Sequence, residues 1–187
     1  MKDLPSHLRK KPVEAWSRED WSTIYHPMKK TSYAHTFAEQ QALPPGFSHW
    51  DIRDAENDTV AHVAARKGAL PGTFDQWSLV NDMGWTVSHC IASKHAHLFP
   101  STFDQWALLV NDGTGISVLD LIIMTRQSLP DTFRAFDYRN VSGEDIMTIA
   151  ANHNNGAVLA QLEARRIAVN IDHALSPAFI RKVAHEC

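Results

Sequence analysis

An internal repeat constrains the fold of this chain more than any other feature of its sequence. Residues 73–77 and residues 102–106 both read Thr-Phe-Asp-Gln-Trp. Further upstream, the Thr-Val-Ala-His of residues 59–62 matches the Thr-Val-Ser-His of residues 86–89. Self-similarity at a period of roughly 20 to 50 residues is typical of arrays in which each unit buries its apolar face against its neighbours. The sequence therefore predicts a tandem array of stacked units.

The repeat can be followed through about five copies of roughly 27 to 30 residues each. The fourth copy carries about two inserted residues before Ser117, and the last copy is degraded. Outside the copies, residues 13–24 and residues 176–183 predict short amphipathic helices that would cap the two ends. The predicted organisation is one continuous domain with a helical N-terminal cap (1–30), five repeats (31–50, 51–77, 78–106, 107–136 and 137–164) and a helical C-terminal cap (165–187).

Each copy is predicted to form a helix, a turn and a second helix. A Thr or Ser at positions 32, 59, 86 and 117 precedes an apolar run, where a hydroxyl can cap a helix. Gly68 suits the end of that helix, and a following Pro suits the first turn of the next one. Helices this short persist in water only when neighbouring units bury their faces. The predicted fold class is therefore all-α: a short solenoid of stacked helix–turn–helix repeats.

The first helix of the repeat resembles the ankyrin repeat. Residues 82–92 (Asp-Met-Gly-Trp-Thr-Val-Ser-His-Cys-Ile-Ala) and residues 58–68 carry the resemblance, which extends over about residues 31–164. A Val replaces the family's Pro after Thr, the period is shorter, and Phe-x-x-Trp replaces the usual Leu pair of the second helix. The chain resembles a divergent ankyrin-repeat protein of bacterial or phage type. The resemblance implies a scaffold that recognises another protein and has no chemistry of its own.

Composition and charge exclude several classes of protein. Hydrophobic residues make up 44% of the chain, which is enough for a substantial core. The net charge is −3, which argues against general nucleic-acid binding and leaves only a basic N-terminal segment, with Lys10, Lys11, Lys29 and Lys30, as a weak candidate. No apolar run reaches the roughly 18 residues that a membrane span requires. Two distant cysteines and the absence of a signal peptide predict a cytoplasmic protein that does not contact a membrane.

The eleven histidines raise the alternative of a metal-dependent enzyme. His35, His62 and His89 share one repeat position, but neighbouring helices lie about 8–10 Å apart, which is too far for shared ligation with Zn–N bonds of about 2 Å. These histidines are instead expected to hydrogen-bond neighbouring turns, and Cys90 is expected to be a buried apolar residue. Standard nucleotide-binding and hydrolase motifs are missing. We therefore expect no catalytic residue, metal, cofactor or small-molecule substrate.

Recognition in such an array falls to the positions that vary between copies. Trp85 holds such a position on a predicted projecting turn, where it is either an exposed binding anchor or folded back on its neighbour. The hypothesis is a non-enzymatic protein that blocks or scaffolds an unidentified partner protein, possible examples being an immunity protein or a phage counter-defence factor. The predicted partner-binding residues are Arg53, Asp54, Glu56, Asp58, Met83, Trp85, Lys94, Arg126 and Arg139.

Overall fold

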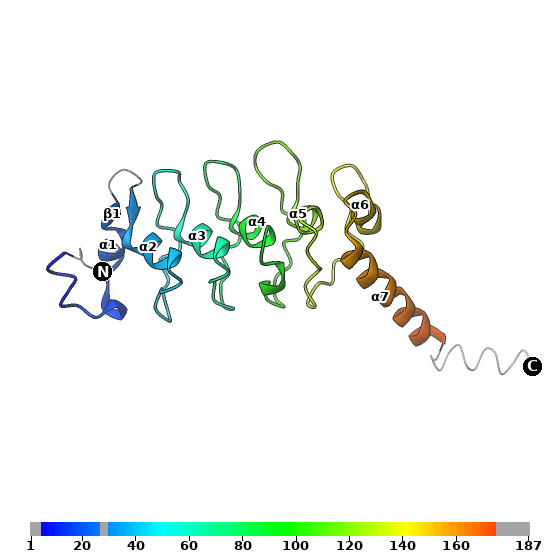
Figure 1. Cartoon of the computed structure of the whole chain (residues 1–187), viewed down its shortest axis with the longest axis horizontal. Coiled ribbons are helices and arrows are strands. Elements are labelled where there is room, and N and C mark those ends of the chain that lie inside the picture. The colour runs from blue at the N-terminus through cyan, green and yellow to red at the C-terminus, as the bar shows by residue number, and fades with distance from the viewer. Residues whose placement is uncertain (1–4, 27–29, 175–187) are drawn as a thin grey trace, which may run out of the picture.

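A computed structural model of the chain describes residues 5–26 and 30–174. Within the described residues, the regular structure is mostly helical, with seven α-helices and one small two-stranded sheet. In chain order the elements are η1 (Val13–Ala15), α1 (Arg18–Ser22), β1 (Ile24–His26), β2 (Thr31–Ser32), α2 (Tyr33–Glu39), α3 (Val60–Arg66), α4 (Val87–Ala92), η2 (Ala96–Leu98), α5 (Val118–Met124), α6 (Ile146–Asn152) and α7 (Gly156–Ala174). The molecule is an elongated row of short helices that ends in the longer α7, with loops projecting beside α3 to α6 (Figure 1).

The helices α2 to α6 begin where the repeat predicts. The side chains of Thr59, Thr86 and Ser117 each accept a hydrogen bond from the backbone N–H three residues later, which confirms their predicted capping role. Asp145 caps α6 in the same way. At Ser32 the structure differs, because its hydroxyl bonds the Nδ1 of His35 and not the backbone. Consecutive helices contact one another along the whole row.

The prediction of a second helix in every copy is wrong. In the second copy, the segment after α3 makes two separate turns, closed by Phe74 N to Pro71 O at 2.9 Å and Leu79 N to Gln76 O at 3.3 Å. The copies around it make the same Pro-to-Phe turn, and η2 adds a single 3₁₀ turn after α4. Successive turns of this kind give the same three-residue spacing of Phe and Trp as a helix does. Among the described residues, α6 and α7 alone form a helix pair joined by a short turn.

An aromatic ladder takes the place of the missing helices. The rings of Trp50 and Phe74 lie 5.5 Å apart, those of Phe74 and Trp77 lie 4.9 Å apart, and both pairs meet edge to face. Each such contact contributes about 0.5–1.5 kcal/mol beyond burial alone. The ladder runs from one unit to the next through buried rings and ends at the partly buried Phe136, whose ring is covered by the guanidinium of Arg165 at 3.7 Å. Its members are Trp16, Trp21, Phe47, Trp50, Phe74, Trp77, Phe103, Trp106, Phe133 and Phe136.

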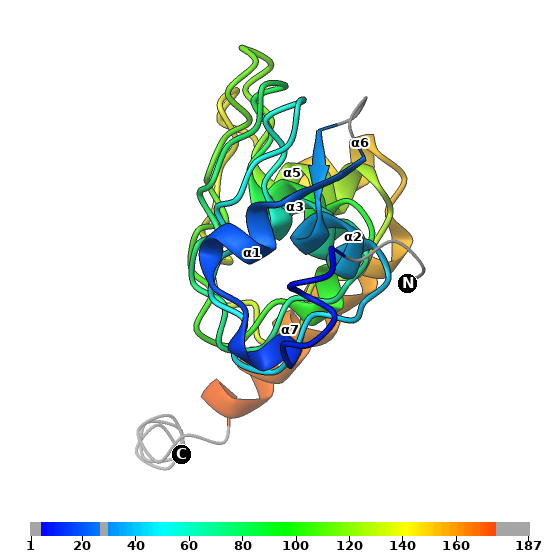
Figure 2. The ribbon, with the colours of Figure 1, turned by 90° about the vertical axis from the view of Figure 1, so that its left-hand side faces the viewer.

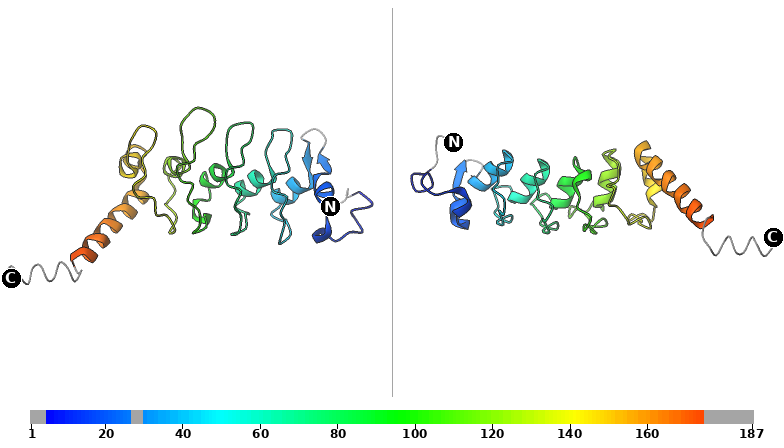
Figure 3. Two further views of the ribbon diagram at one scale, coloured as in Figure 1. Left: turned by 180° about the vertical axis from the view of Figure 1, so that it is seen from behind. Right: turned by 90° about the horizontal axis from the view of Figure 1, so that it is seen from below.

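The two ends of the row differ from the predicted caps. Residues 13–24 form η1 and α1, separated by the N-cap Ser17, and not one helix. The β1–β2 hairpin that follows was not expected from the sequence. At the other end, α7 runs unbroken across residues 164 and 165 and leaves the row obliquely (Figure 3). The predicted helix over residues 176–183 lies outside the described residues.

Four loops precede the helices α3 to α6 and project to the same side of the row (Figures 1 and 2). Each is closed at its base by one antiparallel bridge, between Arg53 and Thr59, Val80 and Thr86, Leu109 and Ser117, or Arg139 and Asp145. We call the four segments between these pairs loop 1, loop 2, loop 3 and loop 4. Loop 3 spans two residues more than the others, which confirms the predicted insertion.

Candidate functional site

Hydrogen bonds between repeats join loops 1 to 3 to one another. The side chain of Asn57 in loop 1 donates to Asp82 in loop 2 at 2.7 Å. Arg53 donates to its own loop at the carbonyl of Asn57 and to the next repeat at the carbonyl of Val80, both at 2.9 Å. Loops 2 and 3 are joined through the backbone, by Asn111 N to Gly84 O at 2.8 Å. Loops 1 to 3 are therefore braced against one another by hydrogen bonds, whereas loop 4 meets loop 3 through the side chain of Val141 beside Gly115.

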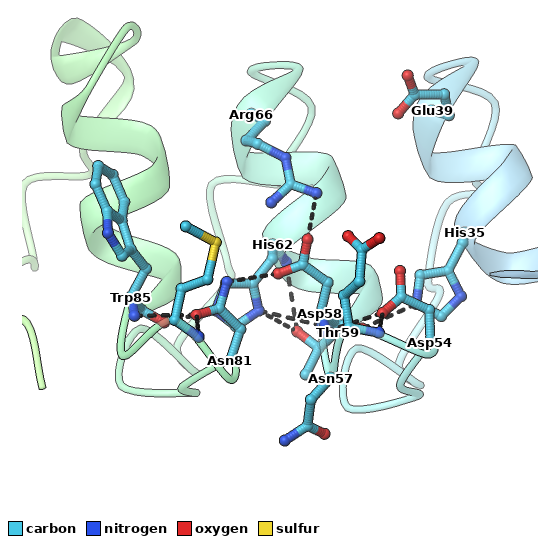
Figure 4. Close-up of polar contacts among 12 residues, drawn as sticks. His35, Glu39, Asp54, Asn57, Asp58, Thr59, His62, Arg66, Asn81 and Trp85 are labelled. Atoms are coloured by element: carbon cyan, nitrogen blue, oxygen red, sulfur yellow. Dashed lines mark hydrogen bonds and ion pairs between the residues drawn. The ribbon is translucent and has the colours of Figure 1, made fainter. Parts of the chain in front are cut away.

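The column of histidines fixes the base of this row (Figure 4). Nε2 of His35 lies 3.1 Å from the carbonyl oxygen of Asp58, and Nε2 of His62 lies 3.0 Å from that of Trp85. Because a carbonyl only accepts, Nε2 carries the proton and Nδ1 accepts from the hydroxyl of Ser32 or Thr59 at 2.8 Å. The predicted role of these two histidines, which is to hydrogen-bond a neighbouring turn, is confirmed.

His89 departs from this pattern. Its Nδ1 contacts Thr86 at 2.6 Å, but its buried Nε2 has no hydrogen-bond partner among the described residues. The carbonyl of Ile116 holds the place that the carbonyl of Trp85 holds one repeat earlier, and it favours the charged ring, but it does not form a hydrogen bond with Nε2. Burial lowers the pKa of His35 and His62, and it lowers the pKa of His89 to about 4. All three imidazoles are therefore neutral near pH 7.

Asp58 belongs to the scaffold of loop 1 and not to its surface. The side chain is buried, and its carboxylate lies 2.6 Å from Arg66 and 2.7 Å from the amide of Asn81 (Figure 4). Burial by itself would raise the pKa of Asp58, but the hydrogen bonds from Arg66 and Asn81 outweigh it and the pKa is lowered. Since its oxygens already have partners, Asp58 is poorly placed to contact another protein.

The other predicted residues of the loops differ in exposure. Met83 in loop 2 is 72% exposed, and Glu56 in loop 1 is also exposed. Asp54 accepts from the backbone N–H groups of Glu56 and Asp58, so it shapes loop 1. Arg139 donates to the carbonyl of Gly143 inside loop 4, as Arg53 does in loop 1.

Trp85 is neither a fully exposed anchor nor fully folded back on its neighbour. Its ring is half-buried against the core and lies 6.3 Å from the ring of His89. Both of its backbone polar groups are occupied, since its N–H donates to Asn81 and its carbonyl accepts from His62. The indole therefore packs partly against the core and the ring of His89 in its own repeat, while part of the ring remains exposed.

The sequence did not single out two exposed loop residues, Val141 and Asp112. Val141 in loop 4 is 67% exposed, and it packs beside Gly115 of loop 3. Asp112 in loop 3 is exposed, and hydrogen bonds from Thr114 lower the pKa of its carboxyl. Asn140 begins loop 4 as Asn81 begins loop 2, and this recurrence in the sequence could have identified loop 4.

Lys94 and Arg126 lie apart from the loops. Each follows the C-terminal end of a helix, α4 or α5, whereas the loops precede the N-terminal ends. Both line a separate groove of about 780 Å³. The predicted set of nine residues is therefore divided between two surfaces of the molecule.

Residues 5–26 and 30–174 contain no group of three or more His, Cys, Asp or Glu side chains that could hold a metal ion. Cys90 is buried, and burial raises the pKa of its thiol to about 11. No helix of the described chain combines the length and apolarity needed to cross a membrane. No protein-family model and no curated protein matches the sequence significantly.

Proposed function

We propose that this chain is a non-enzymatic, ankyrin-like solenoid that binds a partner protein with the row of loops 1 to 4. The observation that carries the proposal is that hydrogen bonds between repeats hold loops 1 to 3 side by side, with loop 4 packed beside loop 3, while exposed side chains remain on the loops. A rigid surface loses little conformational entropy on binding, so exposed side chains on it contribute efficiently to affinity. The shared His, Thr, Phe and Trp positions are buried in the scaffold, which leaves the variable loop positions for recognition.

The charge of the loops favours a partner with a basic surface. The segments between the bridges, residues 54–58, 81–85, 110–116 and 140–144, contain no Lys or Arg. Their exposed or partly exposed carboxylates are Asp54, Glu56, Asp82, Asp112 and Glu144, whereas Asp58 is buried and paired with Arg66. Complementary charge speeds association and rejects wrong partners, while exposed apolar side chains such as Met83 and Val141 supply contact area.

The effect of binding would be to block or to scaffold the partner, as an immunity protein or a phage counter-defence protein does. A cytoplasmic location is part of the proposal, because the buried thiol of Cys90 suits a reducing compartment. The two alternatives, a histidine-dependent metalloenzyme and nucleic-acid binding through the basic N-terminal segment, gain no support from the contacts of the described residues. The described histidines do not converge on a metal site, and Lys11 of the basic segment is already paired with Asp20.

The test is quantitative affinity purification of the tagged full chain from its native host, compared between two variants of equal charge change. Glu56→Lys with Asp82→Lys alters loops 1 and 2. Asp75→Lys with Asp104→Lys alters two exposed residues in the turns that follow α3 and α4. We expect the loop variant to lose about tenfold or more of one specific partner and the turn variant to retain it. Equal retention or equal loss in the two variants would contradict the proposal.

A further inference from the structure

A groove lies on the side of the row away from the loops. The segments 94–99 and 126–132 follow the C-terminal ends of α4 and α5, and together with Gln161 of α7 they enclose the groove of about 780 Å³. Helices of six or seven residues span about 9–10 Å, so the groove and the loops occupy opposite ends of the same helices. A ligand in this groove would not need to contact the loops.

The walls of the groove are fixed by side-chain amides. Gln161 accepts from the N–H of Leu129 at 2.9 Å and donates to its carbonyl at 3.0 Å. Gln127 accepts from the N–H of Ala96 at 3.0 Å and donates to the carbonyl of Ala92. These bonds cross from one repeat to the next, so the groove is formed before any ligand arrives. Phe99 and Leu129, both almost fully buried, give it an apolar floor.

Two exposed cations, Lys94 and Arg126, line the opening of the groove against one carboxylate, that of Asp131. The exposed His97 lies in the same lining. Neither Lys94 nor Arg126 has an ion-pair partner in the described part of the chain. One repeat earlier, the matching residue Lys67 pairs with Glu39 at 2.8 Å. At the place of Glu39, the repeat before Lys94 carries Arg66, which already pairs with Asp58.

A polar atom without a partner lies in the same lining. The Oγ1 of Thr132 is buried and makes no hydrogen bond within the described residues. Buried hydroxyls almost always have a partner, and one that lacks it marks a position where a ligand or water would complete the bonding. The groove thus combines an apolar floor, two unpaired cations and a free hydroxyl.

We propose that this groove binds a short acidic segment of a protein partner, in which carboxylates flank a large apolar side chain. The carboxylates would meet Lys94 and Arg126, and the apolar side chain would rest on Phe99 and Leu129. Cavities of roughly 300–1,000 Å³ accommodate a compact ligand of this size. A long polyanion fits less well, because the chain carries a net charge of −3 and its loops are acidic. This surface is distinct from the loop surface proposed above and does not depend on it.

The backbone conformation at Arg126 allows a substitution that removes the charge without destabilising the fold. Arg126 has φ +59°, and the matching residue Gly68 has φ +66°. A side chain at such a φ is disfavoured by about 1 kcal/mol relative to glycine. Arg126→Gly therefore removes the cation while leaving the fold as stable as before or more stable. Lys67→Ala is the matched control for Lys94→Ala, because Lys67 is the paired residue at the same repeat position.

The experiment selects peptides of about twelve residues from a random phage-displayed library on the immobilised full chain, and then measures their affinity by fluorescence polarisation. We expect the selected peptides to carry Asp or Glu around a large apolar residue. Arg126→Gly and Lys94→Ala should each weaken binding about tenfold, with an unchanged or higher melting temperature for Arg126→Gly. Lys67→Ala and the double variant Glu56→Lys with Asp82→Lys should bind the peptides as the parent chain does.

Several results would overturn the proposal. One is enrichment of basic or uncharged peptides, or no enrichment at all. Another is a set of selected peptides whose affinity is changed neither by Arg126→Gly nor by Lys94→Ala. Tighter binding of a single-stranded oligonucleotide than of the peptides at roughly 150 mM salt would assign the groove to nucleic acid and not to a peptide. Because the loop variant is a control here, failure of the loop proposal leaves this result unaffected.

Discussion

The imidazole Nε2 of His62 lies 3.0 Å from the carbonyl oxygen of Trp85, which follows it by 23 residues. His62 sits inside α3 and Trp85 sits in loop 2, so one hydrogen bond ties the helix of one repeat to the loop of the next. Both ring nitrogens of His62 are occupied, since Nδ1 accepts from Thr59. The orientation of loop 2 is therefore set by a buried side chain of the preceding repeat.

We predict that His62→Leu destabilises the protein more than any substitution at an exposed loop residue. The change removes the bond to the carbonyl of Trp85, which keeps the N–H of Asn81 as its other donor, and the bonds to the hydroxyl and N–H of Thr59. The expected loss in the free energy of unfolding is about 2–4 kcal/mol. It is measured by urea denaturation followed by circular dichroism.

The matched control is His89→Leu. His89 is equally buried, but its Nε2 has no partner to lose among the described residues. Removing an unsatisfied polar group offsets part of the loss of the Thr86 bond, so the expected cost is about 1 kcal/mol or less. Equal losses at both positions would show that the inter-repeat bond contributes nothing measurable.

Stability should fall as the pH is lowered from about 7 to 5. Burial lowers the pKa of His89 from 6.5 to about 4, so the unfolded chain takes up a proton before the folded chain does. This stability is complete above about pH 6.5 and is lost as the pH falls toward about 4, and His89 alone contributes about 2 kcal/mol between pH 6.5 and 5. The lowered pKa values of His35 and His62 act in the same direction.

Urea denaturation at several pH values between about 7.5 and 5 measures this dependence. His89→Leu should reduce the slope of stability against pH in this window, because one of the three titrating groups is removed. A free energy of unfolding that stays constant from about pH 7 to 5 would contradict the burial of neutral histidines.

Loops 2 and 3 approach each other closely at Gly84, so we predict that Gly84→Ala lowers the free energy of unfolding strongly. A Cβ on Gly84 would lie 2.5 Å from the carbonyl oxygen of Asn111, in addition to the strain of φ +78°. Gly113 in loop 3 has a similar φ of +82°, but a Cβ there would meet nothing within 4 Å. We expect Gly113→Ala to cost about 1–2 kcal/mol and Gly84→Ala to cost more than about 3 kcal/mol in thermal or urea unfolding. The opposite order would mean that loops 2 and 3 are not in contact.

Asp58 and Glu56, two acidic residues of loop 1, should respond differently to truncation. Asp58→Ala removes the partner of Arg66 and of Asn81 at a buried position, and we expect a loss of about 2–3 kcal/mol. Glu56→Ala alters an exposed side chain and should change the free energy of unfolding by less than about 0.5 kcal/mol. Differential scanning calorimetry distinguishes the two, and similar melting temperatures for both variants would refute the scaffold role of Asp58.

The sequence alone predicted the features that arise within a few residues of the chain. The capping hydroxyls of Thr59, Thr86 and Ser117 act on backbone groups three residues away, and the alternation of these caps with glycine and proline marks the period. The insertion in loop 3 was also predicted from the sequence, because the extra residues shift the repeat positions that follow them. The candidate binding residues were found as variable positions, without knowledge of which share a surface.

Tertiary structure decided what the segment after each helix becomes. A spacing of three residues between Phe74 and Trp77 fits a helix and fits two successive turns equally well, so local sequence does not choose between them. The choice is made by contact between repeats, because the turns allow each ring to meet the next unit edge to face. Contact between repeats also separates the buried Asp58 from the exposed Glu56. Asp58 accepts from Asn81 of the next repeat as well as pairing with Arg66 of its own, and the spacing along one chain segment does not reveal that contact.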